Sequence, residues 1–254
     1  MLTGLNGKPV KIKKTGAIYP VDVELSSETG ENVLLISSKI NFIDSFMADS
    51  EAPAEWKTAV LDGMRDWSGE YRVFGNQPLN VVVQVEESDK IMDTVFVFCI
   101  DEQAGKDLRD TYGKLNLKKA EQLMAEDRSF ASAGFPAFGW KAYLPRFVYM
   151  LNSTLEDFEY ARRVAKHEFG HILGLGDLYK DLSLGLSGVD GLLFEDIKPY
   201  YKGDGFFDMV MCNSGPVTNN DIEMVLLAFQ TNRFQNYQKC KEKDKVSAAV
   251  GKGN

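Results

Sequence analysis

The chain has 254 residues, of which 44% are hydrophobic and 26% charged. This composition is that of an ordinary globular protein, and it excludes a collagen-like, coiled-coil or wholly disordered chain. Because 29 basic side chains stand against 37 acidic ones, the formal net charge is −8, and we expect no nucleic-acid partner. No apolar run reaches the roughly eighteen residues that a membrane-spanning helix needs, so we expect no membrane span.

The cysteines and the start of the chain bear on where the protein works. Cys99, Cys212 and Cys240 are an odd number without metal-binding spacing, which makes a disulfide framework improbable. Residues 1–16 are lysine-rich and no apolar segment follows them, so no export signal is readable. A reducing compartment and a mature exported fragment both stay open. Nothing indicates a coiled coil or a symmetric patch, and we expect a monomer.

Apolar alternation predicts β-strands in the first part of the chain and again near its middle. The expected strands cover residues 10–13, 21–25, 32–43, 79–85, 94–100 and 146–151, with a turn at Thr29-Gly30 and an irregular edge strand near residues 131–140. The segments 79–85 and 94–100 are rich in Val and Phe and contain neither Gly nor Pro. We therefore expect both to be central and buried.

Four segments are expected to be helical. The first begins near Ser50 and Pro53, the second covers residues 106–127, the third follows a capping box of Ser153 and Glu156, and the last follows Thr218 with Asp221. In the third helix the predicted apolar stripe is Phe158, Ala161, Ala165, Phe169 and Ile172, with a stop at Gly174 and Gly176. Residues 183–208 read as a long loop, and residues 239–254 as a disordered tail.

The two histidines of the chain lie in one His-Glu-x-x-His motif on the third helix, as His167, Glu168 and His171. Four residues of helix bring both imidazoles to one face, where they can bind one zinc ion, and the glutamate can reach a water on that metal. A chance match has a probability of roughly one in a hundred for a chain of this length. Gly174 and Asp177 extend the motif, and a glycine there lets the chain turn back toward the metal.

The extended motif, His167-Glu168-x-x-His171-x-x-Gly174-x-x-Asp177, resembles that of the metzincin zinc endopeptidases. The aspartate-ended form is most similar to snapalysin and to immune-inhibitor-A-type bacterial metalloproteases. The resemblance implies that His167, His171 and Asp177 bind one catalytic Zn²⁺. It also implies a methionine turn beneath the metal, for which Met211 is the best match and Met209 the fallback.

The resemblance further implies an α+β fold, with a twisted mixed sheet packed on two long helices and a C-terminal helix after the methionine turn. Residues 1–238 would form one catalytic domain. Relatives of this clan are secreted, but neither an exported nor a cytoplasmic location is indicated by the chain itself. Several relatives have a tyrosine two residues after the turn methionine, whereas this chain has Asn213.

The expected activity is hydrolysis of peptide bonds by a metal-activated water, with Glu168 as general base and a peptide or protein as substrate. An extended substrate would add to the edge strand near residues 131–136. The alternatives are a narrow-target effector or toxin, a structural zinc site, and a site whose third ligand is Glu195. Asp190, Asp204 and Asp208 could hold Ca²⁺, but their spacing is not that of an EF-hand, and a solvated loop is the favoured interpretation.

Overall fold

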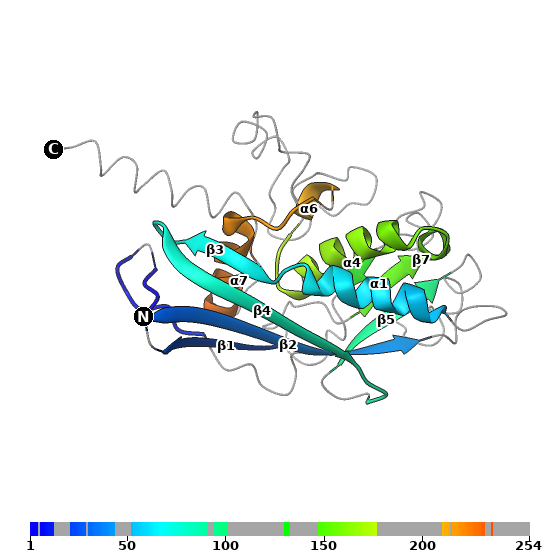
Figure 1. Ribbon diagram of the computed structural model, residues 1–254, viewed down its shortest axis with the longest axis horizontal. Helices are drawn as coiled ribbons and strands as arrows, with labels where there is room; N and C mark the ends of the chain where they lie inside the picture. The colour runs from blue at the N-terminus through cyan, green and yellow to red at the C-terminus, as the bar shows by residue number, and fades with distance from the viewer. Residues whose placement is uncertain are drawn as a thin grey trace.

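The computed structural model of the protein describes residues 1–4, 6–12, 21–28, 30–43, 52–90, 94–100, 130–132, 147–176, 210–213, 215–231 and 235. Within these residues the fold is mixed α+β, as expected, with one twisted sheet and helices packed against it (Figure 1). The predicted helix at 106–127, loop at 183–208 and tail at 239–254 lie outside the described residues. No helix of the described part is long and apolar enough to cross a membrane.

The sheet is seven-stranded, with the order β3-β4-β2-β5-β7-β6, and β1 pairs with β2 beside this path. The strands are β1 Val21–Glu28, β2 Glu31–Ile43, β3 Gly69–Val73, β4 Gln77–Glu87, β5 Thr94–Ile100, β6 Phe130–Ser132 and β7 Phe147–Leu151. The helices are α1 Ala54–Arg65, α4 Phe158–Ile172, α6 Val210–Asn213 and α7 Asn219–Thr231, and a 3-10 turn, η2, covers Asn152–Leu155.

Strand β2 is the centre of the sheet. It pairs in parallel with β4 on one edge; on its other edge, β1 pairs antiparallel with Glu31 to Ser38 and β5 pairs in parallel with Lys39 to Ile43. Beyond β5 come β7, in parallel, and then β6, which is antiparallel to β7 at the end of the sheet order. The expected central positions of β4 and β5 are therefore confirmed, as is an edge strand beginning at Phe130.

The predicted strands differ from the structure in two places. Residues 10–12 form no strand; instead the N-terminal segment makes an isolated bridge between Thr3 and Pro9. The side-chain amide of Gln77 fixes this segment by accepting from the Thr3 amide at 2.9 Å and donating to the Thr3 carbonyl at 2.6 Å. Strand β3 was not predicted, because it has only five residues. Its exposed positions alternate with positions that are half-buried or buried, and this pattern is too short to be recognised in the sequence.

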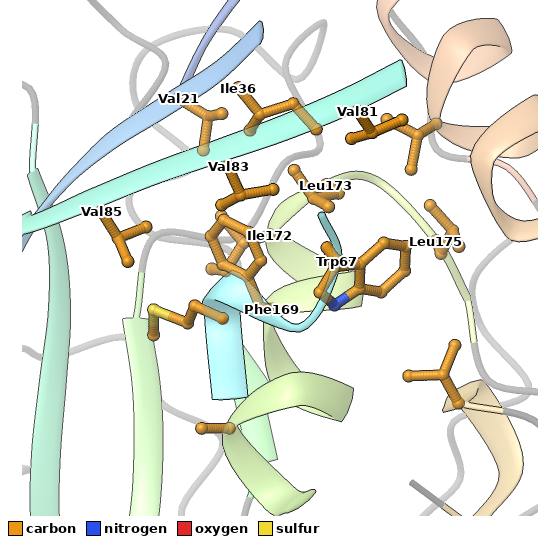
Figure 2. Packing of buried hydrophobic residues seen from close by; sticks show 14 of the residues in the cluster. Val21, Ile36, Trp67, Val81, Val83, Val85, Phe169, Ile172, Leu173 and Leu175 are labelled. Atoms are coloured by element: carbon orange, nitrogen blue, oxygen red, sulfur yellow. The ribbon is translucent and has the colours of Figure 1, made fainter. Parts of the chain in front are cut away.

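One face of the sheet and two helices enclose the core. Alternate residues of β2 and β4 are buried, and α1 and α4 lie side by side over that face (Figure 1). Side chains of β4, of the end of α4 and of Trp67 converge in one cluster there (Figure 2). Cys99 is also buried in this core, as expected.

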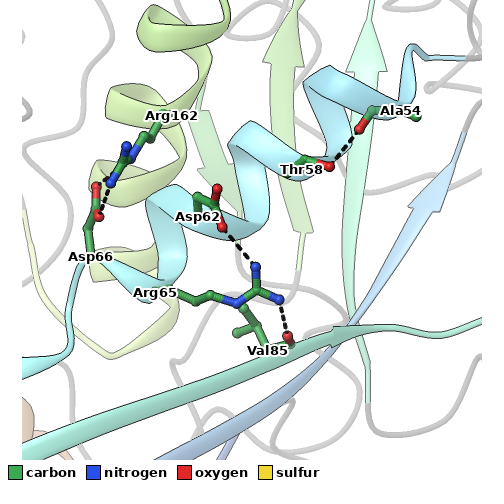
Figure 3. Close-up of polar contacts among 7 residues, drawn as sticks. All are labelled: Ala54, Thr58, Asp62, Arg65, Asp66, Val85 and Arg162. Atoms are coloured by element: carbon green, nitrogen blue, oxygen red, sulfur yellow. Dashed lines mark hydrogen bonds and ion pairs between the residues drawn. The ribbon is translucent and has the colours of Figure 1, made fainter.

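The two helices are joined closely along their length. Gly63 of α1 lies against the main chain of Arg162 in α4, where a Cβ atom would collide with the Arg162 carbonyl group. Arg162 also donates two hydrogen bonds to Asp66, from Nε at 3.0 Å and from Nη2 at 2.7 Å (Figure 3). At the end of α1, Arg65 donates to the Val85 carbonyl of β4 at 2.9 Å, which ties the helix to the sheet.

The helix starts differ partly from the sequence prediction. Helix α1 begins after Pro53 without a side-chain cap, while Ser50 lies outside the described residues. Helix α4 is capped by Asp157, which accepts from the Tyr160 amide at 2.9 Å. The predicted box of Ser153 and Glu156 is therefore wrong, because Ser153 belongs to η2.

The predicted apolar stripe and the last cap were largely correct. Phe158 is 39% exposed and does not belong to the stripe, but its other members are buried, namely Ala161, Ala165, Phe169 and Ile172. Before α7, the Asp221 carboxylate accepts from both the amide and the hydroxyl of Thr218, at 2.6 Å and 2.7 Å. The capping box predicted there is confirmed.

Candidate metal centre

The motif helix is α4, and it presents both histidines on the same side. The rings of His167 and His171 lie with their centroids 5.1 Å apart and their planes at 84°. His167 is 6% exposed and Glu168 is 4% exposed. His171 is partly buried. A helix that buries two adjacent ionisable side chains is unusual for a purely structural element, since such groups lose hydration without gaining apolar contact.

Each imidazole is oriented by a main-chain carbonyl group. Nδ1 of His167 lies 2.7 Å from the Val210 carbonyl oxygen, and Nδ1 of His171 lies 2.8 Å from that of Leu175. Because a carbonyl oxygen only accepts, Nδ1 must be the protonated nitrogen in both rings. In the neutral form of each ring the lone pair is then on Nε2, which is the tautomer that a metal ligand requires.

A methionine and a tryptophan pack beneath the motif. A Cβ atom placed on Gly170 would collide with the sulfur of Met211 and would lie 2.9 Å from Cζ2 of Trp67. The Trp67 indole donates to the Lys166 carbonyl, next to His167, at 2.9 Å. The absence of a side chain at Gly170 therefore lets Met211 and Trp67 reach the helix between its two histidines.

The end of α4 turns sharply at a glycine. Gly174 has a φ of +91°, and its amide donates to the His171 carbonyl at 3.0 Å, while the Leu175 amide donates to the Gly170 carbonyl at 3.0 Å. This is the Schellman arrangement of hydrogen bonds, which ends a helix and reverses the chain. The helix stop predicted at Gly174 is confirmed.

The turn is also paired with a distant part of the chain. The Gln235 amide donates to the Gly174 carbonyl at 2.8 Å, and the Gly176 amide donates to the Gln235 carbonyl at 2.8 Å. Leu175 and Gln235 thus form a parallel bridge, and both are buried. The segment just before Asp177 is fixed by residues that follow α7.

Several predicted site residues lie outside the described residues, namely Asp177, Met209, Glu195, Asp190, Asp204 and Asp208. The described part of the chain ends at Gly176 on this side of the site. Cys212 and Asn213 belong to α6, and only their main chain is described. Among the described residues no group of three or more His, Cys, Asp or Glu side chains could hold a metal ion. The third ligand therefore stays a prediction.

The donor set present is compatible with zinc. Two imidazoles whose neutral forms have the required tautomer are good zinc ligands, and the hydrogen bonds on Nδ1 are the usual support of such ligands. The sequence analysis missed the two supporting carbonyl groups, at Val210 and Leu175, because a main-chain oxygen leaves no signal in residue identity.

Comparisons of the chain with protein-family models, with curated proteins and with solved structures found no match.

Proposed function

We propose that the chain is a zinc-dependent endopeptidase of the metzincin type. The observation that carries the proposal is the pair of imidazoles on α4, each with Nδ1 bound to a carbonyl oxygen and with Glu168 between them in sequence. The order of elements adds support, because α4 packs on a mixed sheet and is followed by a buried methionine and a helix.

His167, His171 and Asp177 would hold the metal. When bound, Zn²⁺ lowers the pKa of a water molecule toward neutrality and polarises the scissile carbonyl group. The carboxylate of Glu168 accepts the proton of the attacking water and delivers it to the leaving amine. The Leu175 and Val210 carbonyl groups keep the two imidazoles in one tautomer and orientation throughout.

The substrate is expected to be an extended peptide. Strand β6 ends the sheet order, and it is in contact with α4. An extended chain added to an edge strand is bound by main-chain hydrogen bonds, which demand little of its sequence. This placement is part of the proposal and is consistent with the edge strand expected near residues 131–136.

The test is hydrolysis of a broad pool of quenched-fluorescent peptides by the zinc-loaded chain and by Glu168→Ala. Loss of a general base is expected to reduce the rate by about 10²- to 10⁴-fold, while metal analysis shows zinc retained. Glu159→Ala is the matched control, because Glu159 is an exposed glutamate in the first turn of the same helix. This control should keep full activity.

A histidine variant and a chelator test whether the activity depends on zinc. His171→Ala should lose zinc as well as activity, and a chelator should abolish the activity of the parent reversibly. Full activity of Glu168→Ala would remove the glutamate from the mechanism. Zinc bound without cleavage of any peptide in the pool would instead favour the narrow-target effector.

A further inference from the structure

We propose that Gln235 is a positioning residue of the metal centre, whose main chain fixes the carbonyl group that orients His171. The inference rests on the proposed function, because a metal-binding imidazole requires a fixed tautomer and direction. It assigns to Gln235, which follows α7, a part in binding zinc, although Gln235 is not one of the proposed ligands.

The hydrogen bonds of the turn divide between two partners. Leu175 directs both of its main-chain groups at α4: its amide donates to the Gly170 carbonyl and its carbonyl accepts from Nδ1 of His171. The flanking groups, the Gly174 carbonyl and the Gly176 amide, are directed at Gln235. This alternation is that of a strand residue in a parallel bridge.

The alternation makes the orientation of His171 depend on Gln235. The Leu175 carbonyl and the Gly176 amide belong to one planar peptide group. Rotating this group away from His171 would therefore also break the Gly176 hydrogen bond to Gln235. Without that partner, Gly174 and Gly176, which flank Leu175, would leave the turn with many accessible conformations. Gln235 is 8% exposed and Leu175 is fully buried, so water does not readily replace these hydrogen bonds.

The decisive variant is Gln235→Pro, since proline removes the amide that donates to Gly174 and leaves the proposed ligands untouched. Gln235→Ala is its control, because it changes the side chain and retains the amide. Removal of a group that orients a metal ligand typically weakens affinity by about 10- to 100-fold. We expect a loss of this size in zinc affinity for the proline variant, measured by chelator competition, and less than about threefold for alanine.

A second pair of variants acts from the other side of the bridge. Gly176→Pro removes the amide that donates to Gln235, and Gly176→Ala retains it. Leu175 already lies in a β-bridge, the extended conformation that a residue before proline favours. The Co²⁺-substituted proline variants should also show an altered d–d absorption spectrum, which reports ligand geometry and would not respond to a loss of stability alone.

A measurement on the parent chain covers the case in which a proline variant fails to fold. If Gln235 favours the metal-bound state, linkage requires that zinc strengthen the bridge. Hydrogen exchange of the Gly176 and Gln235 amides should then slow on addition of zinc. Unchanged exchange, or folded proline variants with parental zinc affinity, would overturn the inference while leaving the endopeptidase proposal intact. A parent chain that binds no zinc would instead overturn the proposed function, and this inference with it.

Discussion

At the scale of single residues, Gly170 is the position at which Met211 and Trp67 pack against the motif helix. The sulfur of Met211 and the ring of Trp67 occupy the space that a side chain would need. The two neighbours differ in how they can respond: a methionine side chain is flexible, whereas an indole ring that donates to the Lys166 carbonyl is not. A substitution here therefore tests the packing under the proposed metal ligands.

We predict that Gly170→Ala lowers the free energy of unfolding by about 1–2 kcal/mol. Overpacking typically costs about 1–3 kcal/mol, and the better helix propensity of alanine returns up to about 1 kcal/mol. The same substitution made together with Met211→Ala should cost less than the sum of the two single changes, because the sulfur that collides is gone. Urea unfolding of the four proteins measures this coupling; strictly additive losses would contradict it.

At the scale of elements, α1 positions α4. Their closest approach is at Gly63, where an added Cβ atom would meet the main-chain carbonyl of Arg162, which cannot turn aside as a side chain can. We predict that Gly63→Ala lowers the free energy of unfolding by about 3 kcal/mol, the upper end of the range for overpacking.

The control for this prediction is Thr58→Ala, on the exposed side of the same helix. It should change stability by less than about 0.5 kcal/mol. Because α4 carries both histidines, Gly63→Ala should also weaken zinc affinity, and chelator competition measures that loss. Parental stability of Gly63→Ala would show that the two helices can separate at no cost.

The sequence predicted the elements whose burial follows a regular period. Strands β2 and β4 and the buried stripe of α4 were found in this way. Strand β5, which is buried along almost all of its length, was found from its Val- and Phe-rich composition. Helix boundaries were less predictable, because several residues before α4 can cap a helix and only the turn η2 decides that Asp157 does so.

The histidine pair of the candidate site was fully visible in the sequence, since the helical period places His167 and His171 on one face. The supporting contacts were not visible. Val210 and Gln235 take part through their main chains, and any residue type would offer the same atoms. Trp67 lies beyond the end of α1, and nothing in the sequence around it indicates its hydrogen bond to the Lys166 carbonyl.

At the scale of the whole molecule, Tyr71 connects three parts of the fold. It lies on β3, donates to the Trp67 carbonyl beyond α1 at 3.1 Å, and faces Asp221 of α7. Burial, followed by the charges of Asp221 and Asp66, raises the pKa of Tyr71 from 10.0 to about 12. Its folded-state pKa is thus above its value in the unfolded chain.

This difference predicts a loss of stability in alkali. The contribution of neutral Tyr71 is complete below about pH 10, where tyrosine in an unfolded chain titrates, and is lost as the pH rises through about 12. Tyr71→Phe should lose about 1 kcal/mol near neutrality, from its hydrogen bond. The parent should approach this variant between pH 10 and 12; urea unfolding of both across this range tests it. A constant difference would contradict the assignment.

From the shared edge of β2 we expect an order of assembly. Strands β1 and β2 are joined by a short turn and can close as a hairpin within about 1–10 μs, whereas parallel partners must wait for distant segments to meet. The hairpin covers the edge of β2 from Glu31 to Ser38. When β5 arrives, only Lys39 to Ile43 remain open to it on that edge. The earliest local structure thereby excludes the wrong registers of a later, slower pairing.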